Sequence, residues 1–165
     1  MAPRQAFWHK RPMADDDVSM HERLRRLEDL DEIRQLFIDY GHHLDAGDFE
    51  AYAALFADDG EVLLGPIGRA KGRPAIVALM TAIRARAKTP SHHLVTSPIV
   101  RLDGDRATSE VQWTVIRPAA DGTLQVAMFG RHHDELVRER GRWRIRRRRG
   151  QVDVPAALPP RPTST

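Results

Sequence analysis

Residues 19–48 read SMHERLRRLEDLDEIRQLFIDYGHHLDAGD, and this stretch decides the fold class. Apolar side chains recur in it at steps of three and four residues, which is the spacing of one face of a helix. This stripe consists of Leu24, Leu27, Leu30, Ile33, Leu36, Phe37 and Tyr40. Ser19 can cap the helix, because Glu22 follows at the capping-box position. We predict a long amphipathic helix that Gly41 and segment 45–48 interrupt.

Two further helices are predicted downstream. A short one carries Phe49, Tyr52, Ala53 and Phe56 and ends at segment 58–60. Segment 61–64 is typical of a short strand, and 65–72 of a turn-rich connection. Pro74 then suits the first turn of a third helix with apolar residues at helical spacing. These are Ile76, Leu79, Met80 and Ile83.

The remaining sequence predicts strands at 94–102, 107–116, 124–137 and 142–152. Turns containing Gly and Asp separate them, at 103–105 and 120–122, and another lies around Gly141. Because helices come first and a meander follows, the pattern favours an α+β domain over alternating βαβ units.

Composition limits the organisation. A chain of 165 residues with 41% hydrophobic residues suits one domain, which we place at 19–154. It lies between a flexible arm at 1–18 and a disordered Pro-rich tail at 155–165. No apolar run approaches the roughly 20 residues that span a bilayer, and no secretory signal is visible, so we expect no membrane contact and a cytoplasmic protein. The absence of cysteine excludes disulfides, thiol catalysis and thiolate metal sites.

The basic residues are concentrated near the C-terminus. Eight arginines fall between Arg138 and Arg149, a density that also occurs in nucleic-acid-binding proteins. However, Trp143 and Ile145 alternate with arginines, which is the period-two pattern of a strand with one solvated face. No stacking platform accompanies the charge, so we predict no nucleic-acid partner.

Six of the eight histidines occur as adjacent pairs, at 42–43, 92–93 and 132–133. Neighbours on a strand point to opposite faces, so each pair in the sheet offers one ring to an interior pocket. Three such rings are enough for a metal site. Because no HExxH or 2-His-1-carboxylate spacing accompanies them, we predict no metal.

Asp45 follows the last apolar turn of the long helix. A carboxylate at the seam between helix and sheet needs a partner, and histidine is the natural one. An Asp–His pair in an apolar cavity is a general base. The alternative is that Asp45 only caps the following helix or its loop, and the residues alone leave both readings open.

Five motifs together resemble the SnoaL-like branch of the nuclear-transport-factor-2-like superfamily. They are Tyr40-xxxx-Asp45, Asp48-Phe49 with Phe56-xx-Asp59-Gly60, HHLVTSP at 92–98, GRHHDEL at 130–136 and GRWRI at 141–145. The resemblance covers roughly residues 24–152. It implies a cone-shaped α+β fold, in which N-terminal helices pack in a strongly curved antiparallel or mixed sheet and enclose a pocket.

The resemblance also implies site residues. Scytalone dehydratase, hexachlorocyclohexane dehydrochlorinase and bile-acid 7α-dehydratase belong to this branch, and Asp45 and His93 correspond to a catalytic Asp–His pair. Tyr40 corresponds to a tyrosine near substrate, and Trp113 and His132 are expected in the pocket. His132 faces inward if Gly130, His132, Asp134 and Leu136 form the concave side.

Some positions depart from these relatives. Leu44 and Leu64 stand where scytalone dehydratase has tyrosines, and Val115 stands where the bile-acid enzyme has an acid. The expected function is therefore a cofactor-independent lyase or isomerase, of the dehydratase type, acting on a small, mostly apolar cyclic molecule. The alternatives are a non-catalytic small-molecule-binding protein or the small structural subunit of a ring-hydroxylating dioxygenase. The resemblance implies a homodimer or homotrimer.

Overall fold

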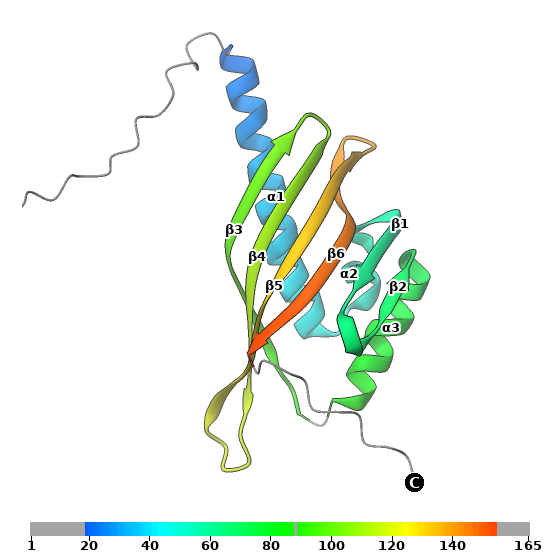
Figure 1. Cartoon of the computed structure of the whole chain (residues 1–165), viewed down its shortest axis with the longest axis vertical. Coiled ribbons are helices and arrows are strands. Elements are labelled where there is room, and N and C mark those ends of the chain that lie inside the picture. The colour runs from blue at the N-terminus through cyan, green and yellow to red at the C-terminus, as the bar shows by residue number, and fades with distance from the viewer. Residues whose placement is uncertain (1–18, 88, 155–165) are drawn as a thin grey trace, which may run out of the picture.

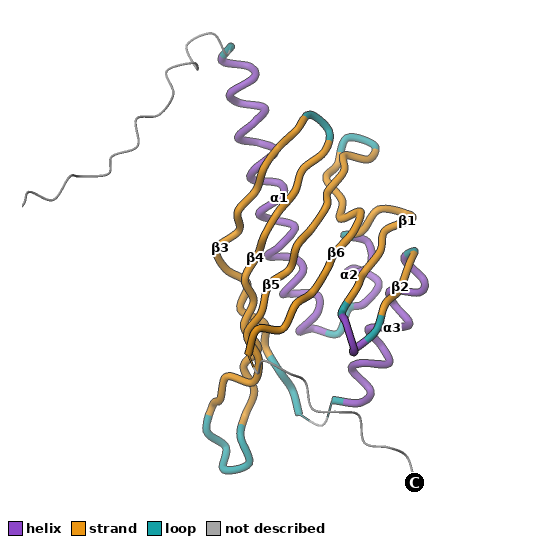
Figure 2. Tube along the Cα trace, viewed as in Figure 1, coloured by secondary structure: helices purple, strands orange, loops and turns teal. Residues whose placement is uncertain are grey.

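A computed structural model describes residues 19–87 and 89–154. The expected arm at 1–18 and tail at 155–165 lie outside these residues. Helices cover one face of a six-stranded sheet of order β2-β1-β6-β5-β4-β3, and Figures 1 and 2 show this two-layer arrangement. The strand neighbours are antiparallel except β1 and β6, which are parallel. The fold is thus α+β, with helices packed on a curved, mixed sheet that does not close.

The first helix, α1 (Met20–Ala46), begins as predicted. Ser19 and Glu22 form both halves of the capping box. The helix then continues through Gly41, so the predicted interruption there is wrong. Gly41 is buried where α1 lies on the sheet, and packing of this helix face outweighs the weak helix propensity of glycine. The helix ends at Gly47, whose φ of 75° provides the left-handed cap.

The second helix is shorter than predicted. α2 (Phe49–Ala54) stops before Phe56, which begins strand β1 (Phe56–Leu63). The predicted stop at 58–60 lies inside this strand, where the pairing with β6 shifts register between Phe56 and Glu61. The 3₁₀ turn η1 (Gly65–Ile67) and strand β2 (Arg69–Lys71) replace the predicted connection. α3 (Arg73–Arg86) has Pro74 in its first turn, as predicted.

The meander agrees with the predicted strands, with longer bounds. It consists of β3 (His92–Asp103), β4 (Arg106–Pro118), β5 (Leu124–Glu139) and β6 (Arg142–Val154). Trp143 and Ile145 are buried as predicted. A register shift near Glu135 and Leu136 then changes the phase of β6, so that Arg148 points inward and is fully buried. The predicted alternation of buried Trp143 and Ile145 with more exposed arginines therefore holds as far as Arg146 and does not extend to Arg148.

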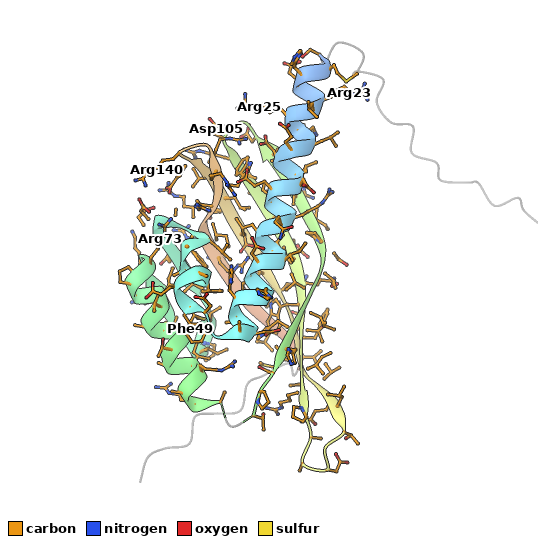
Figure 3. All side chains as sticks on the ribbon, turned by 180° about the vertical axis from the view of Figure 1, so that it is seen from behind. Arg23, Arg25, Phe49, Arg73, Asp105 and Arg140 are labelled. Carbon is orange, nitrogen blue, oxygen red and sulfur yellow. The ribbon has the colours of Figure 1, made fainter. Side chains whose placement is uncertain are left out.

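The helical layer sits in the concavity of the sheet, with α2 between α1 and α3 (Figure 3). The first turns of α1 project beyond the sheet, and the β4–β5 hairpin projects at the opposite end (Figure 1). In the part of the chain that the structure describes, no helix is long and apolar enough to cross a membrane. Large apolar side chains from both layers form the core, among them Ile33, Phe37, Phe56, Ile76, Trp143 and Ile145.

Candidate active site

A cavity of about 590 Å³ lies between the helices and the concave face of the sheet. Its wall is mostly apolar, with side chains from α1, α3 and the sheet that include Leu44, Leu64, Met80, Ile83, Val115 and Met128. Cavities of this size and character accept multi-ring small molecules. Leu44, Leu64 and Val115, which depart from the resembled enzymes, thus belong to the wall of the same cavity.

Asp45 and His93 are in direct contact at the edge of this cavity. Asp45 lies in the last turn of α1, and His93 is the second residue of β3. The distance from His93 Nδ1 to Asp45 Oδ1 is 2.6 Å. The backbone N–H of His93 also donates to both carboxylate oxygens, at 3.1 and 3.0 Å. Backbone and side chain of one residue therefore fix the carboxylate.

This contact determines the tautomer of His93. A carboxylate only accepts hydrogen bonds, so Nδ1 carries a proton, and in the neutral ring Nε2 is the nitrogen with the free lone pair. The His93 ring lines the cavity, and both side chains are largely shielded, with 18% and 19% exposed. Asp48, rather than Asp45, caps α2 by accepting the N–H of Ala51 at 3.0 Å.

His92 lies on the other side of the same carboxylate. Its Nδ1 is 3.4 Å from Asp45 Oδ2, but its side chain is 78% exposed. Adjacent residues on a strand alternate in direction, and His93 is the member of this pair that lines the cavity.

Aromatic side chains surround the deep end of the cavity. The rings of Tyr40 and His132 meet edge to face, with centroids 5.3 Å apart, and the centroid of Trp113 is 5.6 Å from that of His132. Trp113 lies against the backbone of Gly130, where an added Cβ would be 2.4 Å from the indole Cζ2. The absence of a side chain at 130 therefore makes room for the indole.

Burial keeps these polar groups uncharged. It lowers the pKa of His132 well below 6.5, an effect to which the nearby Arg148 adds. It also raises the pKa of Tyr40 above its ordinary value of 10.0. Near neutral pH, His132 is therefore a neutral imidazole and Tyr40 a protonated phenol. Among the described residues, the Nδ1 atom of His132 is buried without a hydrogen-bond partner.

Behind this deep end lies an ion pair that our sequence reasoning missed. Arg148 donates to both oxygens of Asp134, at 2.9 and 2.8 Å, and its guanidinium lies 4.3 Å from the Tyr40 ring centroid. Both side chains are almost completely buried. The available signal was Asp134, which shares the inward face of β5 with His132. A buried carboxylate needs a cation, and the neighbouring strand is rich in arginine.

The inward face of β5 is as expected, since Gly130, His132, Asp134 and Leu136 are all buried. Tyr40, His93, Trp113 and His132 thus line one cavity, with Asp45 bonded to His93. Within residues 19–87 and 89–154, no group of three or more histidine, aspartate or glutamate side chains is arranged to hold a metal ion.

Comparisons with known proteins identify the family. A model of the SnoaL-like domain matches residues 25–149. This chain belongs to the SnoaL-like domain family. The family includes enzymes such as polyketide cyclases. No curated protein matches the chain.

Solved structures resemble this SnoaL-like domain over most of its length. An NTF2-like protein with a cystatin-like fold from Novosphingobium aromaticivorans is 34% identical, covering 86% of this chain and 92% of that chain, with a TM-score of 0.77. ActVI-ORFA from Streptomyces coelicolor is 26% identical. The match covers 75% of this chain and 96% of that chain, with a TM-score of 0.67. A Catenulispora acidiphila protein solved in complex with S-DNPA is 27% identical. The match covers 77% of this chain and 95% of that chain, with a TM-score of 0.69.

Proposed function

We propose that this SnoaL-like domain is a cofactor-independent lyase or isomerase that removes a proton from a small, mostly apolar cyclic substrate. The observation that carries the proposal is the 2.6 Å contact between His93 Nδ1 and Asp45 Oδ1 at the edge of an apolar cavity. It supports a general base in which Nε2 of His93 accepts the substrate proton and Asp45 stabilises the resulting imidazolium.

The proposed dehydration breaks a C–H bond and a C–O bond, and it forms an Nε2–H bond and the second bond of a C=C double bond. Nε2 of His93 takes a proton from a ring carbon, and the electrons of that C–H bond form a double bond to the neighbouring carbon. The hydroxyl group leaves that neighbour with the electrons of its C–O bond and departs as water by taking the proton from the imidazolium of His93, which regenerates the base. In an isomerisation, the proton returns from Nε2 to a different carbon.

In this proposal, Tyr40 and His132 hydrogen-bond the leaving group or a developing oxyanion. Both side chains line the cavity, and the ring centroids of Tyr40 and His93 are 6.4 Å apart. Since burial keeps both groups neutral, each donates a hydrogen bond without adding charge. Donors fixed before the reaction stabilise developing negative charge more effectively than mobile water.

Proton abstraction can be tested before the natural substrate is known. Cyclic β-hydroxy ketones would be incubated with the protein in D₂O, with deuterium incorporation followed by mass spectrometry and enone formation by absorbance. We expect His93→Gln and Asp45→Asn each to lower the rate at least about 10²-fold, which is the low end of general-base catalysis. His92→Gln is the matched control, because this neighbouring histidine does not line the cavity, and we expect a less than about threefold change from an exposed charge pair.

The rivals predict different results. A binding protein would hold a ring compound that stays chemically unchanged and incorporates no deuterium, in the wild type as in His93→Gln. A structural subunit is expected to fill its pocket with side chains, whereas an open cavity of about 590 Å³ supports ligand binding. Full activity in correctly folded His93→Gln or Asp45→Asn would exclude the mechanism.

A further inference from the structure

The charged groups around the cavity suggest what kind of ligand it takes. Arg84 and Arg117 line it, together with the hydroxyl-bearing Thr89 and Ser91, and no Asp or Glu of residues 19–87 and 89–154 is among the lining residues. A cavity whose charged lining residues are all basic attracts an anion. A planar oxyanion is the group that guanidinium binds best, because the two can form paired hydrogen bonds.

Both arginines lie close to the catalytic pair. Arg84 is in the last turn of α3, and its Nη2 is 3.4 Å from the backbone oxygen of Asp45. Arg117 follows Ile116, the residue of β4 that pairs with His92 at the start of β3. The two arginines thus line the cavity from opposite layers of the fold, Arg84 in contact with the backbone of Asp45 and Arg117 next in sequence to the residue that pairs with His92.

The cavity has an exposed end, which we call its mouth, and a buried end. Arg84 and Arg117 are exposed, whereas Tyr40, Trp113 and His132 are buried. Arg84 and Arg117 also have no carboxylate partner in the described part of the chain, unlike Arg131, Arg138, Arg147 and Arg148. Their positive charge is therefore not neutralised by a neighbouring side chain. Because both arginines are exposed, an anion bound at this mouth keeps part of its hydration.

We propose that the ligand of this cavity is an apolar ring compound with a carboxylate, which Arg84 and Arg117 bind at the mouth while the rings lie against the apolar wall. This inference rests on the proposed function, since it concerns the same cavity. It assigns Arg84 and Arg117 to substrate positioning and specificity: holding the carboxylate at the mouth fixes which ring carbon faces Nε2 of His93.

Matched ligands separate charge from shape. The neutral fluorophore N-phenyl-1-naphthylamine would be displaced by 1-naphthaleneacetate or by its neutral amide, 1-naphthaleneacetamide. We expect the wild type to bind the acid about tenfold more tightly than the amide, which corresponds to about 1.4 kcal/mol. We expect the Arg84→Gln/Arg117→Gln variant to lose this preference by weakening the acid alone, and salt to reduce it in the wild type.

The controls distinguish this inference from the catalytic one. Arg101→Gln/Arg146→Gln removes two exposed arginines outside the cavity and should keep the preference. His93→Gln should keep it too, because binding of the carboxylate does not need the base. Ala127→Trp narrows the cavity that Ala127 lines and should weaken binding of the fluorophore, which distinguishes binding in the cavity from binding at an outer surface.

Several results would overturn the proposal. They are a wild type that does not prefer the acid, an Arg84→Gln/Arg117→Gln variant that keeps the preference, equal weakening of acid and amide, and full binding in Ala127→Trp. A preserved preference together with an inactive wild type would leave the ligand class standing and reject the catalytic proposal.

Discussion

At the scale of single residues, the buried Arg148–Asp134 pair is the costliest contact to break. Removing one member of a buried ion pair leaves an uncompensated charge and typically costs about 3–5 kcal/mol. We expect Asp134→Asn to lower the free energy of unfolding by this amount, measured by urea denaturation. The control is Glu135→Gln on the next residue, whose contact with Arg147 at 3.3 Å is exposed and contributes less than about 1 kcal/mol. Equal losses in the two variants would contradict the assignment.

His132 gives the protein a pH-dependent stability. Burial lowers its folded-state pKa well below 6.5, while an unfolded histidine titrates near 6.5. Below about pH 6.5 the unfolded chain therefore binds more protons, and the free energy of unfolding falls with acidification by up to about 1.4 kcal/mol per pH unit. We expect this slope between about pH 7 and 5, above the range in which carboxylates titrate.

The comparison of two variants isolates this contribution. His132→Gln should flatten the slope of unfolding free energy against pH, whereas His133→Gln, on the exposed side of the same strand, should leave it nearly unchanged. An unaltered slope in His132→Gln would show that the buried ring is not the source.

At the scale of elements, Gly41 shows that a glycine inside α1 does not end the helix. A Cβ at this position would lie 3.4 Å from Val95 Cγ2 and 3.6 Å from the His93 oxygen, which is ordinary contact. Since alanine favours a helix over glycine, we expect Gly41→Ala to raise the free energy of unfolding by about 0.5–1 kcal/mol. Gly130→Ala is the contrast, because its Cβ would lie 2.1 Å from the Gln151 oxygen. A loss of stability in Gly41→Ala would contradict this packing.

The elements also show what the sequence could predict. Periodicity and caps were sufficient for α1, α3 and the meander, because each has a regular apolar face. They failed at Phe56, whose spacing suits a helix but which pairs with Ile145 of β6, a strand that only the fold brings alongside. They also failed at Arg148, because the shift in the β5–β6 register reverses which residues of β6 face inward, and no local pattern reveals such a shift.

The candidate site could be predicted from the sequence only in part. The histidine pairs and the position of Asp45 suggested an Asp–His contact. They did not show which histidine is the partner, or whether Asp45 only caps a helix, because Asp45 and His93 are separated by 48 positions in the sequence. The choice of His93 came from family resemblance. Arg84 and Arg117 were missed because single arginines on a helix and a strand resemble any solvated side chain until the fold places them around one cavity.

At the scale of the whole molecule, the outer face of the sheet carries exposed apolar side chains. Leu94, Val126 and Val154 are 49%, 66% and 57% exposed. The pairing Leu94–Thr114–Phe129–Val154 crosses four adjacent strands, so these side chains share one face. Apolar patches of this kind on soluble proteins commonly mark contacts between proteins.

We expect a second copy of this chain to cover the outer sheet face, in a homodimer or homotrimer. In a two-fold contact of a homodimer, each apolar patch buries its counterpart, whereas in a trimer it meets a different surface of the next copy. Light scattering after size exclusion should then give a multiple of the 18.7 kDa chain mass, and Leu94→Glu/Val126→Glu should shift it toward the monomer, because two buried like charges oppose each other across the interface. Leu27→Glu is the control, since Leu27 is similarly exposed but lies on α1. A monomeric wild type at all concentrations, or an oligomer unaffected by the double substitution, would show that this face is not the interface.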